Sequence, residues 1–157
     1  MCNETTRTAL DGIAHMVGEE IGLGAWFTID QPSVDEFAEV THDRQFIHVD
    51  PARAAAGPFG GTVAHGYFTL ALLPYLADLQ SDRRLSVPHR ISVNYGLDKV
   101  RFIAPVRIPS DIRLRTVLRS AEAKGPDVLR LVYGHIVEIR DSARPALAAD
   151  AITLLYL

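Results

Sequence analysis

The chain has 157 residues, of which 48% are hydrophobic and 22% are charged, and its formal net charge is −3. This length suits one domain, so we expect residues 1–157 to form a single folding unit. The charged fraction is close to the globular average, and the apolar fraction excludes a disordered chain. A sequence pI of about 6.0 and the lack of a basic stripe disfavour nucleic-acid binding.

The single cysteine, Cys2, excludes a disulfide framework or a CxxC metal site within the chain. We expect it to lie in a frayed N-terminal segment. The opening residues lack the basic start and apolar core of a secretion signal. The most apolar stretch is interrupted by Pro74, Asp78 and Gln80 and is too short to cross a membrane. We therefore expect a soluble cytoplasmic protein with no membrane partner.

Two short helices are predicted in the first third of the chain. Ser33 and Glu36 have the spacing of a capping box, and the residues after Ser33 place apolar side chains on one face of a helix over 34–41. Asp50 precedes a proline, which is typical of an N-cap followed by the first helical position. This second helix is expected over 51–56.

A longer helix is predicted over 64–79, after a glycine-rich loop. Its side chains are apolar nearly all round, and a helix without a polar face belongs at the centre of a fold. Pro74 either kinks this helix or marks a break in it, and the sequence leaves the two open.

The second half of the chain changes to the alternating pattern of strands, and one more strand is expected near the start. The expected strands cover residues 24–30, 91–95, 112–119 and 129–139, with a last one ending at 157. Short turns between successive strands favour antiparallel pairing. The predicted fold class is α+β, with a curved antiparallel sheet wrapped around a long central helix.

Polar residues gather between the two early helices, and the pair Asp43 and His48 is the most informative. Five residues apart, the two side chains diverge on a helix by about 140° and lie on opposite faces of a strand. They converge only if the segment is an irregular loop, where catalytic residues are often held. The alternative is that Asp43 caps a turn and His48 is exposed. With His42 these residues offer no third spaced ligand, so no metal site is expected.

A run of small residues over 60–66 leads into the predicted central helix. Free N–H groups at such a helix start, together with the helix dipole, favour developing negative charge. Glycines 60, 61 and 66 would let a ligand approach the backbone closely. No Gly-Lys-Ser/Thr follows, so this is not a phosphate-binding P-loop. The alternative is that the glycines only permit tight packing of helix on sheet.

These residues resemble the MaoC-like, (R)-specific enoyl-CoA hydratase family of hotdog proteins, and its nodulation-protein-N-like branch in particular. The resemblance runs from about residue 26 to residue 105. The segments that carry it are DRQFIH (43–48) and PFGGTVAHG (58–66), supported by FA (37–38), HVDP (48–51) and NYGLDKVRF (94–102).

The resemblance implies a hotdog fold and reversible addition of water to a trans-2-enoyl thioester, which gives an (R)-3-hydroxyacyl thioester. Asp43 and His48 would hold and deprotonate the water, since water needs a base poised near neutral pH. The N–H of Gly66 would stabilise the thioester oxygen as an oxyanion donor. The resemblance implies no cofactor apart from the coenzyme A of the substrate, and an acyl carrier protein could take its place.

Further residues are candidates for binding the substrate. Phe46, Gly61 and Tyr67 are assigned to the acyl and thioester portions, although a plain core role suits Tyr67 better. Lys99 and Arg101 are candidates for the coenzyme A phosphates, because long cationic side chains suit that role. Solvated charges at a strand end are the alternative for both.

The remaining histidines carry weaker expectations. His42 stands where the hydratase pattern has glycine, which places the loop geometry in question, although histidine tolerates a left-handed backbone better than most residues. His65 is expected to pack or cap at the helix start, and His135 to be a hydrogen-bonded core residue. His15 and His89 are expected on the surface.

The family resemblance also implies an assembly, a homodimer with its sheets joined edge to edge and the substrate tunnel near the interface. Two other functions stay open beside the hydratase. One is an acyl-CoA thioesterase on the same fold. The other is a non-catalytic acyl-binding or dimerisation subunit.

Overall fold

The computed structural model describes residues 2–80 and 85–157. Its elements are α1 (Glu4–Ile13), the 3₁₀ turn η1 (Ala14–Met16), β1 (Glu20–Leu23), β2 (Phe27–Ile29), α2 (Gln31–Thr41), α3 (Phe46–Val49), α4 (Pro51–Ala55), α5 (Gly66–Ala71), α6 (Leu73–Asp78), β3 (Ile91–Phe102), β4 (Ser110–Ala123), β5 (Val128–Ile139) and β6 (Leu147–Tyr156). The prediction of an α+β protein is confirmed.

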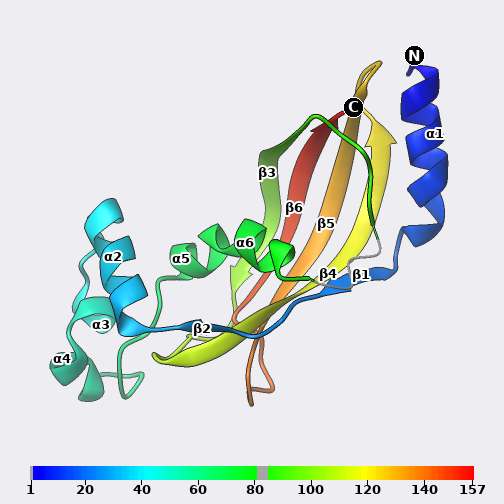
Figure 1. The fold of residues 1–157 in the computed structure, drawn as a ribbon. Coiled ribbons are helices and arrows are strands. Elements are labelled where there is room, and N and C mark those ends of the chain that lie inside the picture. The colour runs from blue at the N-terminus through cyan, green and yellow to red at the C-terminus, as the bar shows by residue number, and fades with distance from the viewer. Residues whose placement is uncertain (1, 81–84) are drawn as a thin grey trace.

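One antiparallel sheet organises the molecule, in the order β1-β4-β5-β6-β3, with β2 also pairing with β4. Its twisted strands lie behind α5 and α6, while α2, α3 and α4 form a lobe beyond one end of the sheet (Figure 1). The strand β3 follows the helices in sequence yet pairs with the last strand, β6. This crossing connection places the helices over one face of the sheet.

The N-terminal segment is ordered, so the expectation of a frayed start is wrong. Asn3 caps α1 by accepting a hydrogen bond from the backbone N–H of Thr6 at 2.8 Å. The Thr6 hydroxyl is fully buried and donates to the carbonyl of Pro126 in the turn between β4 and β5. Ile13 at the end of the helix joins an apolar cluster with the sheet. These contacts hold α1 against the sheet.

The early helix begins before the predicted capping box. Asp30, and not Ser33, is the N-cap of α2, since its carboxylate accepts hydrogen bonds from the N–H and hydroxyl of Ser33. Pro32 occupies the first turn, where its missing N–H costs nothing. The strand expected over 24–30 is shorter, since β2 covers only Phe27–Ile29, and the strand β1 before it was not predicted; both pair with β4.

The central helix predicted over 64–79 is broken in two. Leu72 ends α5 and begins α6, because Pro74 in the first turn of α6 cannot continue the preceding hydrogen-bond ladder. The helix pair is also less enclosed than expected. Leu73 and Leu76 are buried against the sheet, but Tyr67 is 69% exposed and Tyr75 is 47% exposed.

The sheet has one apolar and one polar face, as the alternating pattern predicts. Along β4 the residues Ile112, Leu114 and Leu118 are fully buried. The intervening Arg113 and Arg115 pair with Glu138 on the opposite face, at 2.6 Å and 3.1 Å. These arginines therefore lie on the hydrated face of the sheet.

The strand β3 differs from the other long strands because it is exposed on both faces. It is longer than the predicted 91–95, and two register shifts interrupt its pairing with β6. Its exposed apolar side chains are Ile91, Val93, Tyr95, Leu97 and Phe102. Across residues 2–80 and 85–157, no helix combines the length and hydropathy needed to span a membrane.

Candidate functional site

The lobe beyond the sheet carries the predicted pair Asp43 and His48. Helix α2 ends at His42, which has the left-handed conformation (φ 61°, ψ 14°) that glycine adopts most easily. A short loop over 42–45 follows, and α3 then holds His48. The predicted irregular loop is thus present. His42 takes over the backbone conformation for which a glycine would be suited.

His48 is buried, with 7% of its surface exposed, so the alternative of an exposed histidine is wrong. Its Nδ1 lies 2.6 Å from the carbonyl oxygen of Val63, and a carbonyl only accepts, so Nδ1 carries the proton. In the neutral ring, Nε2 is then left with the lone pair. Burial lowers the pKa of His48 from its ordinary value, outweighing the opposite effect of the Val63 hydrogen bond. These features give a neutral imidazole that can accept a proton.

His65 lies directly against His48. The two rings stack with centroids 3.7 Å apart and an interplanar angle of 25°. His65 is 2% exposed and donates from Nε2 to the backbone carbonyl of Asp43 at 2.9 Å. Its Nδ1 is the one buried side-chain polar atom that lacks a hydrogen-bond partner within the described parts of the chain. The expected packing at the start of the helix is confirmed, with a direct link to Asp43 in addition.

Residues from three segments fix the position of His48. The Gln31 side chain donates to the His48 carbonyl at 2.7 Å and accepts from the Thr62 hydroxyl at 2.6 Å. The N–H of Val63 donates to the carbonyl of Ile47 at 2.9 Å. The base nitrogen is therefore oriented by α2 and by the extended segment that leads into α5.

The Asp43 carboxylate and the imidazoles of His48 and His65 converge. Each offers one potential ligand atom, and these atoms all lie within 4.8 Å of one another. Sequence spacing supplied no third group, whereas folding brings His65 to the pair from 22 residues downstream of Asp43. The three side chains can bind and deprotonate one water molecule, and their donor types also suit a metal ion.

Gly66 begins α5 immediately after His65. A Cβ atom at this position would lie 2.8 Å from the Phe102 ring, so close packing against β3 requires glycine here. The packing interpretation of this glycine is therefore correct. The N–H of Gly66 also belongs to the first turn of the helix, where backbone donors have no intrahelical acceptor.

The loop before α5 is anchored by Arg107, whose guanidinium donates to the carbonyl of Gly60 at 2.8 Å. Gly60 has φ 66°, which explains the glycine. Gly61 lies beside the same guanidinium. Phe46 is half-buried in α3 below the guanidinium of Arg53, 4.1 Å from its ring centroid.

The other predicted contacts lie away from this loop. Tyr67 packs against Phe102 with ring centroids 5.6 Å apart. Lys99 is exposed and pairs with Asp150 at 3.1 Å, while the exposed Arg101 donates to the neighbouring carbonyl of Val100. Neither Lys99 nor Arg101 has a contact with Asp43 or His48 among the described interactions.

The histidines outside the site match their expectations. His15 and His89 are exposed. His135 is a buried core residue whose Nδ1 lies 3.1 Å from the Thr116 hydroxyl.

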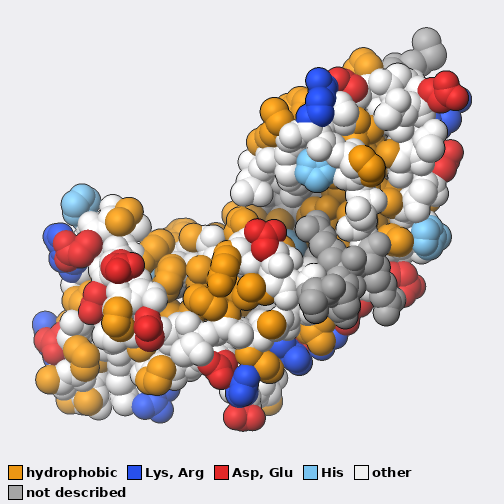
Figure 2. All heavy atoms as spheres, in the orientation of Figure 1, with side chains coloured by type: hydrophobic (Ala, Val, Ile, Leu, Met, Phe, Trp, Pro, Cys, Tyr) orange, Lys and Arg blue, Asp and Glu red, His pale blue; other side chains and the backbone are white. Residues whose placement is uncertain are grey.

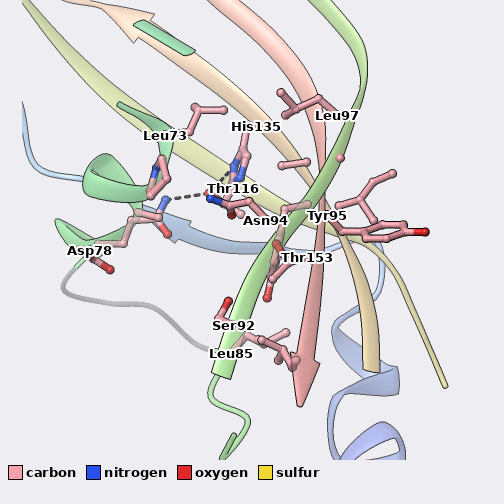
Figure 3. Close-up of a pocket in the computed structure, with 18 of the residues that line it drawn as sticks. Leu73, Asp78, Leu85, Ser92, Asn94, Tyr95, Leu97, Thr116, His135 and Thr153 are labelled. Atoms are coloured by element: carbon pink, nitrogen blue, oxygen red, sulfur yellow. Dashed lines mark hydrogen bonds between the residues drawn. The ribbon is translucent and has the colours of Figure 1, made fainter. Parts of the chain in front are cut away.

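A cavity lies near the site, but Asp43, His48 and His65 do not line it. It has a volume of about 1000 Å³ and is enclosed by α5, α6, residues 85–89 and the sheet face below them. Among the described residues, Tyr67 is the first lining residue along the chain, one position after Gly66. Figure 3 shows its polar side chains pointing in from the strands.

Comparison with known proteins gives a consistent family. The sequence matches the model of the MaoC like domain over residues 13–136. It is 43% identical over 150 residues to nodulation protein N of Rhizobium leguminosarum bv. viciae, covering 94% of this chain and 91% of that protein. It is 45% identical over 140 residues to 3-hydroxyacyl-thioester dehydratase Z of Mycobacterium tuberculosis, covering 89% and 91% respectively.

Solved structures support the predicted hotdog fold. The R-hydratase PhaJ1 of Pseudomonas aeruginosa superposes with a TM-score of 0.63 at 21% identity, over 87% of this chain and 82% of that one. Identity at this level relates the folds alone. The sheet around α5 and α6 is thus a hotdog sheet, as the sequence resemblance implied.

Proposed function

The chain belongs to the MaoC-like dehydratase family, and on that premise we propose that it catalyses reversible hydration of trans-2-enoyl-CoA to (R)-3-hydroxyacyl-CoA in fatty acid metabolism. The observation that carries the proposal is the convergence of Asp43 and His48 in one loop. The dehydratase named among its relatives acts, by its name, on a 3-hydroxyacyl thioester. We place the reaction in the cytoplasm, where the single thiol of Cys2 stays reduced.

The proposed reaction uses one water molecule and no metal or cofactor. His48 Nε2 accepts a proton from the water while the Asp43 carboxylate orients it, and the water oxygen bonds to C3 of the enoyl chain. The electron pair of the C2–C3 double bond moves toward the thioester carbonyl, which forms an enolate. The proton held by His48 is then delivered to C2 on the same face, so the net addition is H and OH.

The enolate oxygen requires a donor, and we assign this role to the N–H of Gly66. An oxyanion donor of this kind contributes about 3–4 kcal/mol to the transition state. Phe46, Gly61 and Tyr67 are assigned to contacts with the acyl thioester. Lys99 and Arg101 remain the proposed contacts for the coenzyme A phosphates, in which case Lys99 exchanges its Asp150 partner for a phosphate.

Incubation with crotonyl-CoA tests the proposal and separates its alternatives. Loss of enoyl absorbance without release of free thiol is expected, whereas thiol release would identify a thioesterase. Lack of turnover with every enoyl chain length, and with acyl-carrier-protein thioesters, would favour a non-catalytic binding subunit. Activity is expected to persist after dialysis against a chelator. Chiral analysis should give the (R) product.

When kcat/KM is plotted against pH, the midpoint of its acid limb is expected to lie below 6.5, the ordinary pKa of histidine. His48 must be neutral to accept a proton, and burial lowers its pKa, so the neutral form persists to lower pH. The measurement is kcat/KM for crotonyl-CoA between about pH 5 and pH 8. A midpoint above 6.5 would contradict the assignment of His48 as the base.

We also propose that the chain acts as a homodimer joined through β3. This strand is the last in the sheet order, and it carries several exposed apolar side chains, namely Ile91, Val93, Tyr95, Leu97 and Phe102. Figure 2 shows further apolar side chains gathered over α5 and α6, where Tyr67 and Tyr75 are exposed. Open apolar edges are ready sites for pairing with another strand.

The dimer is expected to dissociate when a charge is placed on this edge. Val93→Lys should give a monomer at micromolar concentration, because a lysine opposes strand pairing at an edge. Val17→Lys is the matched control, since Val17 is similarly exposed, at 43% against 38%, and lies outside every strand. Light scattering measures both. A monomeric wild-type protein would contradict the proposal.

A further inference from the structure

We propose that the cavity between α5, α6 and the sheet binds the distal part of the acyl chain, and that it selects chains bearing a neutral oxygen function, a hydroxyl or a ketone. This inference rests on the proposed function for the identity of the thioester. The feature that carries it is a group of polar side chains on the sheet wall, opposite helix residues that are mostly apolar.

The helix side of the cavity is suited to a hydrocarbon chain. Leu70, Leu73 and Ala77 line it from α5 and α6, and Leu85 and Val87 line it from the segment before β3. A purely alkyl chain would be expected to meet the same kind of surface on the opposite wall. The sheet wall instead combines apolar residues, among them Ile152 and Leu155, with polar ones.

The sheet wall contains a buried hydrogen-bonded chain. The Gln80 amide donates to the Thr116 hydroxyl at 2.9 Å, and Thr116 lies 3.1 Å from His135 Nδ1 (Figure 3). A hydroxyl has two lone pairs and one proton, so Thr116 can accept from Gln80 and also hydrogen-bond to His135, in the direction that the histidine tautomer sets. All three side chains are at most 8% exposed. The strands thus keep a polar floor where apolar residues would pack more simply.

Next to this chain are two side chains with unused hydrogen-bonding capacity. Thr153 of β6 is 8% exposed and lines the cavity, and its hydroxyl has no hydrogen-bond partner among the residues that the structure describes. Asn94 lies directly opposite Thr153 on β3 and also lines the cavity. Asn94 is exposed, and the Thr153 hydroxyl is not among the fully enclosed atoms that lack a partner, so both groups are open to a ligand that hydrogen-bonds to them.

The charges around the cavity favour a neutral ligand group. No lysine or arginine lines it within the described ranges, and Asp78 contributes a carboxylate at its edge. A carboxylate at the end of an acyl chain would therefore meet no lysine or arginine among the described lining residues, and Asp78 would repel it. A hydroxyl or ketone can hydrogen-bond to Thr153 and Asn94 without that cost.

The position of the cavity fits a chain that begins at the catalytic loop. Gly66, the proposed donor to the thioester oxygen, immediately precedes Tyr67, which lines the cavity. An acyl chain whose carbonyl is held at Gly66 can therefore follow α5 toward the polar wall. The oxygen function is expected several carbons beyond the thioester.

Calorimetry with saturated acyl-CoA molecules tests the inference without requiring turnover. The probes are alkanoyl-CoA, terminally hydroxylated alkanoyl-CoA and the corresponding dicarboxyl mono-CoA thioester, over a series of chain lengths. At one or more lengths the hydroxylated probe should bind about three- to tenfold more tightly than the plain one, as one added neutral hydrogen bond predicts. Equal affinities at every length, or preference for the carboxylate, would overturn the inference.

Thr153→Val removes the hydroxyl while keeping the shape of the side chain. The preference for the hydroxylated probe over the plain one should fall to about onefold. Thr8→Val, an exposed threonine in α1, should keep the preference. Retention of the preference in Thr153→Val would refute the assignment. Hydration of crotonyl-CoA without any hydroxyl preference rejects the cavity assignment alone, whereas a preference without hydration rejects the proposed reaction alone.

Discussion

Replacement of Asp43 by asparagine is expected to reduce turnover of crotonyl-CoA by about 10²–10⁴-fold, the usual contribution of general acid–base catalysis. The substitution keeps the shape of the side chain and removes the charge that orients the water. It leaves the backbone carbonyl that accepts from His65, so the loop should keep its conformation. Circular dichroism and the melting temperature should therefore change little.

His48→Ala should abolish activity to the same extent, but it also leaves the Val63 carbonyl without its donor. His48→Asn separates the two effects, because the asparagine amide can still donate to Val63 while no basic nitrogen remains. We expect both variants to be inactive and only the alanine variant to be destabilised.

Matched controls lie in the N-terminal segment, where Asp11→Asn and His15→Ala change exposed residues of the same types. Both controls should retain full turnover. An active Asp43→Asn or His48→Asn protein would exclude the proposed mechanism. Inactivity confined to the two site variants would support it.

The sequence was sufficient to predict the strands with strict alternation and the convergence of Asp43 with His48. Along β4 the period of two is uninterrupted over its central residues, because one face is buried and the other is hydrated. The spacing of Asp43 and His48 showed only that they could converge in an irregular loop, and the family resemblance implied that they do. The local pattern therefore carried the strand prediction alone.

Other features depend on contacts between distant segments. Thr6 gives no apolar signal, yet its hydroxyl secures α1 to the turn at Pro126. The length of β3 was underestimated because its register shifts and the left-handed Lys99 interrupt the alternation. From the sequence, Pro74 could either kink the helix predicted over 64–79 or break it. The structure shows the break, and α6 after it packs against β4.

The position of His65 was likewise beyond local reasoning. Its neighbours in sequence predict only a helix start, and the ring reaches Asp43 and His48 because Val63 and Ala64 are held in extended conformation between α3 and Val106. A buried histidine with one ring nitrogen bonded to the Asp43 backbone and its face on His48 is suited to position both. Its substitution should therefore affect the reaction as well as the stability.

His65→Leu is expected to lower kcat by about 10–100-fold, since it leaves a buried carbonyl at Asp43 without its donor, a loss of about 1–3 kcal/mol. His65→Gln can restore a donor near the position of Nε2 and should recover part of the rate. His15→Leu is the control for a histidine-to-leucine change at an exposed position.

The pH profile distinguishes positioning from plain packing. The neighbouring His65 lowers the pKa of His48 through their electrostatic interaction, so both His65 variants should move the acid limb of kcat/KM to higher pH. A packing defect that leaves His48 buried would reduce activity and the melting temperature without moving the limb. An unshifted limb in a folded His65→Gln protein would therefore restrict His65 to the structural role that its place at the start of α5 predicts.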